Sequence, residues 1–495
     1  MKKKKRIIII GGGLSGLAAA LHLAVKGHDV MILEKNKYVG GQLLRTIEKG
    51  YAFHYGANFL TMPDVLLDLF QTAKKKLSDY LTLVPLHPPC RFFFPDGTSF
   101  DLTKNLPEVL TKRKSIFKIE VDHFFDLCQY SHTLMQKKLH HQSTLSLLFH
   151  QLKNQYYRYY RKPLAELNNQ FFQDPQIQQF FNFFAMFESL SPAQASPHLL
   201  YMVHEILHSG LYAIKEGTYR LIEALVQILY ELGVQIRTEA EVCKILTECF
   251  EVVGIELTDG TQLPADIILC SIDPKSTYQH LLKGFSQAAK VAKKFHKNEP
   301  LLSGHYLLLG VKKTYQKLSY HNFFFSKNPE QELHFLFEKK EPAPDPTVYV
   351  GVSSLVNPQH APEGKQNLII FSHVPPLREG ENWEQYRKPF YSSYRIKVIT
   401  KLEKMGLHQL ERNIEWEKEI TPDELKEYLK SVGGTIYGMG SPKKRMPPFH
   451  AYKAEKINSL YFIGNSVASG HHISSILLSS KMITEQIEKE IQTYV

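Results

Sequence analysis

Residues Arg6 to Gly16 read RIIIIGGGLSG, a run of four isoleucines followed directly by a glycine-rich turn. The isoleucines predict a strand that is buried on both faces, as in a parallel sheet. Gly11, Gly13 and Gly16 then match the G-x-G-x-x-G spacing of dinucleotide-binding turns. In such turns the first glycine permits the tight turn, the second lets the backbone approach a pyrophosphate, and the third lets the next helix pack closely on the sheet.

A helix and a second strand complete this unit. Apolar residues recur at i, i+3, i+4 and i+7 from Leu17 to Ala24, which predicts an amphipathic helix, and Gly27 is placed to end it. The start of this helix directs backbone N–H groups and a partial positive charge at bound phosphates. Glu34 follows the second apolar strand at the distance where an acid accepts hydrogen bonds from a ribose 2′-hydroxyl, which favours an unphosphorylated ribose over that of NADP. We therefore predict an α/β fold that begins with a Rossmann-like domain.

The length and composition place the chain among ordinary globular proteins. With 495 residues, 43% of them hydrophobic, the chain can form two or three domains with sizeable cores. Lys2 to Lys5 precede an apolar run, but glycines interrupt that run, so we reject a secretory signal peptide. No window reaches the roughly eighteen uninterrupted apolar residues of a membrane span, so any membrane contact is expected to be peripheral.

The cysteines predict neither a disulfide framework nor a metal site. They form no C-x-x-C pair and no spacing typical of metal ligands; they are Cys90, Cys128, Cys243, Cys249 and Cys270. We interpret them as reduced thiols of a cytoplasmic protein.

The charge of the chain is strongly positive. Lys and Arg outnumber Asp and Glu by 60 to 49, which gives a formal net charge of +11 and favours an anionic partner or surface, with solubility alone as the other explanation. The basic segments are short and scattered and no recognition motif is present, so nucleic acid is not expected as a partner. The segment Tyr156–Lys162 mixes aromatic rings with cations, as interfacial segments do, although an exposed basic helix explains it equally well. We therefore predict peripheral association with an anionic membrane surface.

A resemblance to a known family becomes clear after Glu34. The stretch from Gly11 to Gly41, with Glu34-Lys35 and Gly40-Gly41, resembles the FAD-binding start of the bacterial phytoene and diapophytoene (carotenoid) desaturases, which share a flavoprotein superfamily with the amine oxidases. The likeness continues at Gly50–Ala57 and returns at Lys215–Leu225, and it extends over nearly the full length. It implies FAD as the cofactor and a hydrophobic polyene, collected from the membrane, as the substrate.

The resemblance also implies which parts of the chain form each domain. Residues 1–75, 211–284 and 441–495 are expected to form the FAD-binding domain, of the glutathione reductase or amine oxidase type. Residues 76–210 and 285–440 are expected to form an inserted α+β domain for substrate binding and membrane docking. Its aromatic clusters, Phe180–Phe187, Phe92–Phe94 and Phe323–Phe325, suit an apolar tunnel, although each cluster alone also fits a well-filled core.

The resemblance further implies a set of cofactor-binding residues. They are Gly11, Gly13, Leu14, Ser15, Gly16, Glu34, Lys35, Gly41, Gln42, Val242, Gly464, Asn465 and Ile473. Val242 ends a strand region where family members clasp the adenine, and Gly464 allows close approach of the backbone. The final helix is expected to point its start at the isoalloxazine ring, where the positive helix end favours the anionic reduced flavin.

Three positions near the expected cofactor depart from the family pattern. Gln42 stands where an Arg is usual beside the diphosphate, His54 stands where an Asp is usual, and 469–475 read SGHHISS in place of a glycine- and proline-rich run. Gln42 can still donate a hydrogen bond, and Arg45 or Lys35 can replace the missing cation. His54, His471 and His472 are candidates for an acid, a base or a hydrogen-bond partner of the flavin, with a purely structural role as the alternative. No catalytic base is assigned.

The expected reaction is desaturation of a phytoene- or diapophytoene-like carotenoid precursor. The alternatives on the same scaffold are oxidation of carotenoid end groups, flavin-dependent isomerisation of a polyene, and saturation of a retinoid-like polyene. A non-catalytic escort protein is a further alternative, against which the intact Gly11, Gly13, Gly16 and Glu34 speak. Substrate length (C30 or C40), the number of double bonds introduced, the terminal electron acceptor and the oligomeric state stay open.

Overall fold

The isoleucine run forms the central strand of a five-stranded parallel sheet in the computed structural model. This model describes residues 4–112, 118–139, 156–295, 297–378, 380, 388–440, 452–464, 467 and 472–493. The strand order is β21-β13-β1-β2-β9. The strands are β1 (Arg6–Ile10), β2 (Asp29–Leu33), β9 (Gln235–Arg237), β13 (Ile267–Cys270) and β21 (Leu460–Phe462). Ile8 pairs with Met31 on one side and with Ile268 on the other, so β1 is buried as predicted.

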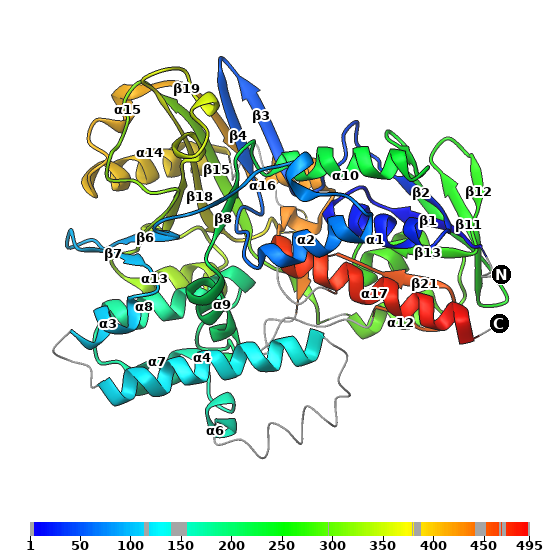
Figure 1. Cartoon of the computed structure of the whole chain (residues 1–495), viewed down its shortest axis with the longest axis horizontal. Helices are drawn as coiled ribbons and strands as arrows, with labels where there is room; N and C mark the ends of the chain where they lie inside the picture. Colours follow the sequence, from blue (N-terminus) through cyan, green and yellow to red (C-terminus); the bar gives the residue numbers. More distant parts are fainter. Residues whose placement is uncertain are drawn as a thin grey trace.

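Helices cover this parallel sheet and bury its apolar side chains. They are α1 (Leu14–Val25), α2 (Pro63–Thr72), α10 (Tyr219–Glu231) and α17 (Ile473–Thr493). Helix α1 contacts both α10 and α17, and Figure 1 shows the chain termini together at the far end of this lobe. Isoleucines at helical spacing predict one apolar face of this last helix: Ile476, Ile483, Ile487 and Ile491. The face is confirmed, because the first three are buried in this core and Ile491 packs against it.

A small antiparallel sheet lies beside the parallel one. Its strands are β10 (Val242–Glu248), β11 (Glu251–Leu257) and β12 (Gln262–Pro264). The dipeptide Asp259-Gly260 predicts a hairpin turn, and this turn is confirmed because it joins β11 to β12. Val242 was expected to end the strand before this sheet, and that expectation is wrong. The earlier strand ends at Arg237, and Val242 begins β10, where it pairs with Leu257.

A second, larger sheet forms the other lobe (Figure 1). It has seven strands in the order β19-β15-β18-β17-β16-β6-β7. The strands are β6 (Cys90–Phe93), β7 (Ser99–Leu102), β15 (Ser303–Val311), β16 (His321–Phe324), β17 (Val348–Gly351), β18 (Gln366–Val374) and β19 (Ile414–Ile420). Side chains of β15 alternate between two cores: Leu307 and Leu309 face α14 (Lys388–Lys404), whereas Tyr306 and Leu308 face the opposite side.

A layer of helices packs below this sheet and is rich in phenylalanine. Its main members are α3 (Leu106–Thr111), α4 (Lys118–Leu139), α7 (Leu164–Phe171), α8 (Pro175–Phe183) and α9 (Tyr201–Ser209). The phenylalanines from Phe180 to Phe187 are expected on one helix, but α8 ends at Phe183 and a 3₁₀ turn, Phe184–Glu188, follows. Phe181 stacks on Phe172 with ring centroids 4.9 Å apart.

Helix α16 (Pro422–Leu429) lies between the two lobes (Figure 1). The sequence Thr421-Pro422-Asp423-Glu424 predicts a capping box and a helix that runs to Gly433. The capping box is confirmed: Thr421 caps the helix start, and the Glu424 side chain accepts from the Thr421 N–H at 2.9 Å. The helix was expected to run to Gly433, and that expectation is wrong. Lys430 adopts a left-handed backbone conformation (φ 51°), which ends the helix at Leu429.

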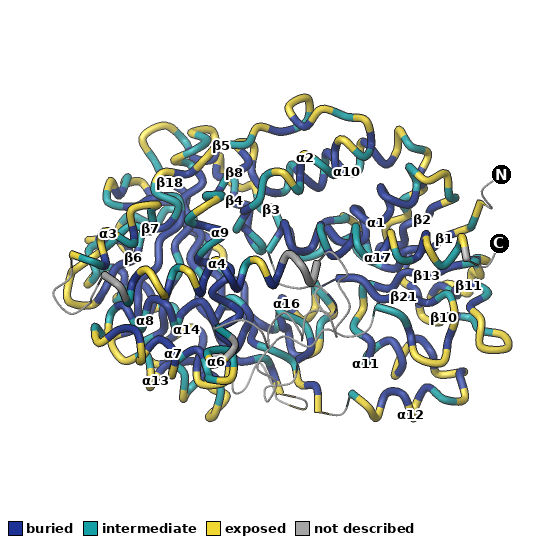
Figure 2. Tube along the Cα trace, turned by 60° about the horizontal axis from the view of Figure 1, so that its bottom comes forward, coloured by how far each residue is buried: buried dark blue, intermediate teal, exposed yellow. Residues whose placement is uncertain are grey.

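The packing links the two lobes more closely than the expected segment boundaries suggest. The hairpin of β3 (Leu44–Glu48) and β4 (Tyr51–Tyr55) lies in the predicted FAD-binding segment but packs on the large sheet. Conversely, α12 (Ala288–Ala292), predicted for the substrate region, packs in the core of the parallel sheet. Figure 2 shows that buried residues run through both lobes.

The segment expected to dock on a membrane turns its rings inward. Tyr156, Tyr159 and Tyr160 pack against the helical core, and Arg158 and Arg161 are exposed. Among the described residues, no helix combines the length and the hydrophobicity needed to cross a membrane.

Candidate active site

The turn between β1 and α1 brings the backbone of the strand and the helix into close contact. Gly11 has φ 105°, a left-handed conformation that suits glycine, and its N–H donates to Leu33 O at 2.9 Å. A Cβ at Gly16 would lie 2.1 Å from Gly11 O, which no side chain tolerates. Gly16 therefore has the predicted role of letting the helix approach the sheet.

Gly13 faces open space at the start of α1. A Cβ placed there would meet Gly41 Cα at 3.7 Å, an ordinary contact, and φ at Gly13 is −74°. The adjacent loop is held by the bond from Gly40 N to Gly12 O at 2.9 Å. The fold of the chain does not require glycine at position 13. The space that this glycine leaves free at the helix start can hold a phosphate group, as the phosphate-binding turn of a dinucleotide site does.

Glu34 lies buried beside this turn, with 5% of its surface exposed. Its carboxylate accepts from Gly12 N at 2.8 Å and from Asn36 N at 2.9 Å. An ionised carboxylate offers about four acceptor positions, so these bonds leave capacity for the hydroxyls of a ribose. The residues at this end of the sheet therefore fit the adenosine part of FAD.

The two cations considered as substitutes for the missing Arg have other partners. Lys35 Nζ donates to Leu429 O of α16 at 3.0 Å, and its burial lowers the pKa to about 8. Arg45 pairs with Glu223 at 2.6 Å and lies over the ring of Tyr219. Gln42 lines the cavity described below.

The C-terminal part of the predicted cofactor site lies against the same turn. Gly464 has φ 91°, and a Cβ there would be 3.4 Å from Ser15 Oγ. Ser480 Oγ donates to Ser15 O at 3.2 Å, and this bond joins α17 to the start of α1. Ile473 is fully buried at the start of α17. Two predicted site residues, Asn465 and His471, lie outside the described residues.

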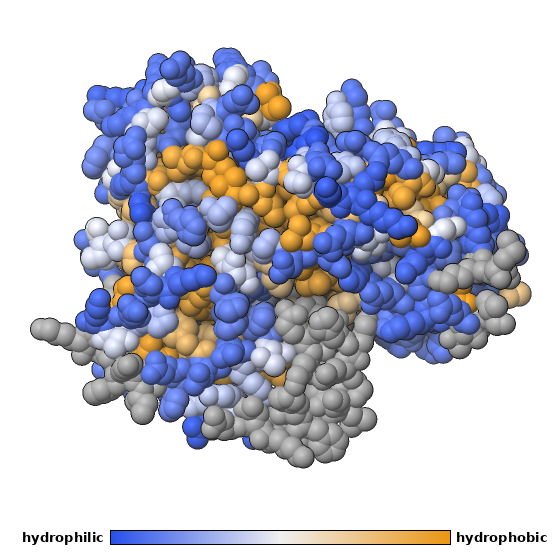
Figure 3. Space-filling model, in the orientation of Figure 1, coloured by the Kyte–Doolittle hydropathy of each residue, from blue (hydrophilic) through white to orange (hydrophobic). Residues whose placement is uncertain are grey.

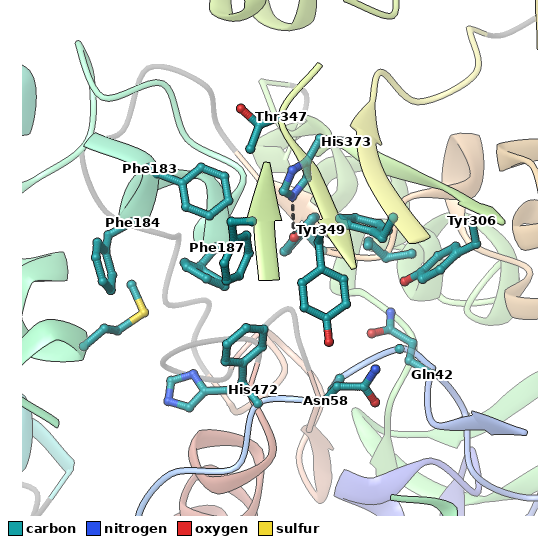
Figure 4. Close-up of a pocket in the computed structure, with 18 of the residues that line it drawn as sticks. Gln42, Asn58, Phe183, Phe184, Phe187, Tyr306, Thr347, Tyr349, His373 and His472 are labelled. Carbon is teal, nitrogen blue, oxygen red and sulfur yellow. Dashed lines mark hydrogen bonds between the residues drawn. The ribbon is translucent and has the colours of Figure 1, made fainter. Parts of the chain in front are cut away.

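A large cavity opens between the start of α17, helix α16 and the large sheet. It has about 1330 Å³ of empty volume, part of it open to solvent. Aromatic rings form much of its wall: Phe59, Phe183, Phe184, Phe187, Tyr306, Phe323, Tyr349, Phe371 and Tyr437. Figure 4 shows Phe183, Phe184, Phe187 and Tyr349 on one side of the cavity, and His472, Asn58 and Gln42 on the other.

The predicted aromatic clusters divide between the cavity and the core. Phe183, Phe184, Phe187 and Phe323 line the cavity, as expected for an apolar tunnel. The remaining rings are buried against one another, as in a filled core: Phe92, Phe93, Phe94, Phe180, Phe181, Phe324 and Phe325. Both interpretations of the clusters therefore hold, for different residues.

Two histidine–tyrosine pairs, each joined by a hydrogen bond, lie on the side of the cavity formed by the large sheet. His373 Nε2 and the Tyr437 hydroxyl are 2.7 Å apart (Figure 4), and His321 Nδ1 and the Tyr349 hydroxyl are 2.8 Å apart. Burial lowers the pKa of His373 and of His321 to about 3 in each case. Both imidazoles are therefore uncharged at neutral pH, and this wall suits an apolar ligand.

Sequence reasoning missed Glu205, a carboxyl group that lines the cavity. Glu205 is 2% exposed, and Thr61 Oγ1 donates to it. Burial raises the pKa of Glu205 to about 7, against a smaller lowering by the Thr61 bond. Glu205 shares the buried face of α9 with Tyr201, Met202 and Ile206. A lone acid on the apolar face of a helix was the sequence signal that could have identified it.

The two described histidine candidates differ in position. His54 is not among the cavity residues; its ring stacks on His360 at 5.1 Å, and burial lowers its pKa to about 3. His472 lines the cavity and stacks on Tyr201 at 6.3 Å, and burial lowers its pKa to about 4. Of the two, His472 alone is placed to contact a ligand in the cavity.

Comparisons with known proteins agree with this geometry. Residues 14–377 match the family described as flavin containing amine oxidoreductase. This chain belongs to that family. The match implies FAD as the cofactor, and FAD supplies the electron acceptor when bound.

Among solved structures, an oxidoreductase from Methanosarcina mazei shares the fold, with a TM-score of 0.67 and 15% identity over 97% of this chain and 99% of that one. Cyclohexylamine oxidase from Brevibacterium oxydans IH-35A also shares the fold, with a TM-score of 0.62 and 15% identity over 99% of this chain and 100% of that one.

Full-length relatives of this flavoprotein act on carotenoids. A 4,4′-diaponeurosporene oxygenase of Staphylococcus haemolyticus is 32% identical over 98% of this chain and 97% of its own length. The Staphylococcus aureus protein of the same name is 31% identical over 98% of both chains. The chain is therefore an FAD-dependent oxidoreductase of the carotenoid-modifying branch. The relatives favour the end-group oxidase alternative over the expected desaturase.

The two glycines of the turn give a direct test of the cofactor cradle. We expect Gly16→Ala to lower the melting temperature of the apoprotein, because its Cβ meets Gly11 O at 2.1 Å. Gly13→Ala is expected to melt like the wild type but to purify with little FAD, because its methyl group occupies phosphate space. Melting curves and the flavin absorbance of both variants measure the two effects. Equal FAD content in Gly13→Ala and the wild type contradicts the assignment.

The buried neutral histidines predict a loss of stability in acid. The pKa of His54 is about 3 in the folded protein and 6.5 when unperturbed, so only the unfolded chain binds a proton between these values. Its contribution to the free energy of unfolding is complete above pH 6.5 and falls by up to about 1.4 kcal/mol per pH unit below it. We expect His54→Gln to reduce the difference in denaturation midpoint between pH 5 and pH 7. The exposed His334→Gln is the control, and an equal reduction in both variants refutes the prediction.

Proposed function

We propose that this flavoprotein oxidises the end group of a diaponeurosporene-like carotenoid. The observation that carries the proposal is the identity of 31 to 32% over 98% of the chain with two 4,4′-diaponeurosporene oxygenases. The cavity supports it, because a polyene lacks polar groups and must be held by burial against apolar walls, at roughly 0.8 kcal/mol per buried methylene.

The proposed cofactor site combines three parts of the chain. Glu34 accepts the ribose hydroxyls, and Gly13 and Gly41 leave room for the diphosphate at the start of α1. Gly464 and Ile473 would hold the isoalloxazine ring at the start of α17, and Gln42 and His472 lie in the cavity wall. Val242 lies buried at the start of β10, where it supports the adenine side.

The polar lining of the cavity favours reaction at a chain end. Gln42, Asn58, Thr61, Glu205 and His472 all reach the cavity. A desaturase acts along the hydrocarbon part of a polyene, which needs no hydrogen-bond partner. An end group that acquires oxygen does need partners, since a polar group buried without one costs about 1 to 3 kcal/mol in protein mutants. The polar side chains therefore suit an oxygenated carotenoid end.

Binding in the cavity orients the substrate and excludes water. The rings of Phe187 and Tyr349 hold the polyene against the side that carries His472 (Figure 4). When bound, FAD would supply the hydride acceptor, and Phe187 and Tyr349 would hold the reacting carbon close to it and aligned.

The substrate reaches the protein from a membrane, and we propose peripheral docking from the cytoplasmic side. The net charge of +11 supports attraction to anionic lipid. Figure 3 shows hydrophobic residues gathered near the centre of one face, between the lobes. Exposed large side chains on the surface include Leu67 on α2 and Ile47 on β3, with exposed fractions of 39% and 60%.

The reaction is tested with the holoprotein and liposomes that contain either 4,4′-diaponeurosporene or diapophytoene. We expect flavin reduction with diaponeurosporene, because a hydride leaves the terminal methyl carbon and water then adds at this carbon and loses a proton. The product has therefore gained one oxygen at an end group, with its number of conjugated carbon–carbon double bonds unchanged. Mass spectrometry and the visible spectrum separate this outcome from desaturation. Gly13→Val, which cannot place the diphosphate, is the matched inactive control. Conversion of diapophytoene to a longer polyene, without oxygen gain, supports the desaturase and overturns the proposal.

Docking is tested by sedimentation of liposomes with the bound protein. We expect binding to anionic liposomes to fall as salt rises from low to physiological concentration and above, because ions screen exposed charges beyond about 8 Å at 0.15 M. Binding to neutral liposomes is the control. Equal binding to both kinds of liposome at every salt concentration contradicts an electrostatic contribution.

A further inference from the structure

We propose that Glu205 is the base that takes the hydroxyl proton when a carotenoid end-group alcohol is oxidised to an aldehyde. This inference rests on the proposed function and adds a catalytic residue to it.

The position of Glu205 is the first support. Among the described residues that line the cavity, Glu205 is the only carboxylate, and none is Lys or Arg. Its side chain is almost completely buried on α9, close to the aromatic wall. A buried acid without a cation beside it is costly to retain unless its surroundings or its ligand use it. In this cavity, an alcohol is a ligand whose hydroxyl can donate to the carboxylate.

The connection of Glu205 to the flavin side is the second support. Thr61 Oγ1 donates to the Glu205 carboxyl, and Thr61 O accepts from Ser474 Oγ. Ser474 belongs to the first turn of α17, which is the helix start assigned to the isoalloxazine ring. A single residue, Thr61, therefore joins the carboxyl to the Ser474 side chain at the helix start assigned to the flavin. An alcohol held by Glu205 stands at the cofactor end of the cavity.

No Lys or Arg lies among the described residues of the cavity wall around Glu205, and a second buried carboxyl, Glu188, acts on the same tyrosine, Tyr201. Tyr201 faces it from the same helix, Glu188 faces Tyr201 from the 3₁₀ turn, and His472 contributes from the start of α17. The pKa of Glu205 responds to burial, which raises it, and to Thr61, which lowers it. His472 is neutral above a pKa of about 4. A carboxyl that titrates near pH 7 is well matched to accept a proton at neutral pH.

The step balances with the oxidised flavin as hydride acceptor. The O–H bond of the alcohol breaks and its proton moves to the Glu205 carboxylate. A C–H bond on the same carbon breaks and its hydride moves to the flavin, while the carbon–oxygen double bond forms. The products are the aldehyde, protonated Glu205 and the two-electron-reduced flavin. Release of the proton from Glu205 to solvent restores the base.

The variant Glu205→Gln tests this role, because it keeps the shape and removes the base. The substrate is the end-group alcohol of diaponeurosporene in liposomes with the holoprotein. We expect the rate of flavin reduction to fall by about 10² to 10⁴, the range for loss of a general base, with FAD content and polyene affinity unchanged. The wild-type rate should rise with pH through about 7, as the carboxylate forms, and the variant should lose this rise.

A second readout does not depend on turnover. The corresponding polyene aldehyde is bound to the oxidised holoprotein, and its visible absorption is recorded against pH. Protonated Glu205 can donate a hydrogen bond to the aldehyde oxygen, which shifts the polyene band to longer wavelength. We expect the shift on lowering the pH through about 7 in the wild type and its absence in Glu205→Gln. A merely structural carboxyl gives no such difference.

Two further variants sharpen the test. Thr61→Val removes the bond that lowers the pKa of Glu205, so both pH profiles should move to higher pH. Glu188→Gln is the matched control, because Glu188 is a second buried carboxyl on the same side that does not line the cavity. We expect the wild-type pH profile in Glu188→Gln.

The outcomes separate this inference from the proposed function. If the wild type converts the alcohol and Glu205→Gln does so at the same rate, with the aldehyde shift intact, Glu205 is not the base. The proposed function then stands. If the wild type does not convert the alcohol, the role of Glu205 fails. The proposed function fails with it only if diaponeurosporene also gains no oxygen.

Discussion

The contact between Gly16 and the carbonyl of Gly11 is the constraint on which the rest of the structure depends. With no side chain at Gly16, helix α1 sits directly on β1, and a Cβ there would lie 2.1 Å from Gly11 O. This closeness fixes where the start of α1 points and how far it stands from Glu34. Helix α17 then packs along α1, and Ser480 bonds to the backbone of Ser15. The start of α17, and with it one side of the cavity, is therefore positioned by a contact between two glycines.

The cofactor segment and the substrate cavity are joined by direct hydrogen bonds. Lys35 and Asn36, which follow the buried acid Glu34, donate to Leu429 O and Tyr428 O at the end of α16. Leu425 and Leu429 of the same helix line the cavity. The loop that follows Glu34 is thus attached to the wall against which a polyene would lie. The two lobes form one site because side chains from each meet in this cavity.

Sequence reasoning predicted the elements that repeat a pattern and missed those that depend on packing across the chain. Local sequence alone determines the structure of three features, and all three were confirmed: the isoleucine strand, the glycine-rich turn and the Thr421 capping box. The predictions of where α16 ends and of where Val242 lies in its strand were wrong. Hydrophobic patterns do not reveal the left-handed backbone of Lys430 or the pairing of β10 with β11. The division of the phenylalanines between cavity and core is likewise set by residues far apart in sequence.

The candidate catalytic residues show the same limit. The histidines stood out because they depart from a family motif, yet His54 packs against His360 away from the cavity. Glu205 carries no motif, and its place in the cavity follows only from the fold of α9 against Thr61. The choice between desaturation and end-group oxidation rests on relatives and on polar cavity residues, neither of which follows from periodicity or spacing.

A structure of the protein with FAD and diaponeurosporene bound tests the central claim most directly. We expect the isoalloxazine ring at the start of α17, next to Gln42 and His472, with one polyene end in the same cavity, close to Thr61 and Glu205. The remaining chain should lie along Phe187, Phe323 and Tyr349. A polyene whose middle, rather than its end, lies over the flavin would contradict end-group oxidation, and FAD away from the Gly13 turn would contradict the whole site.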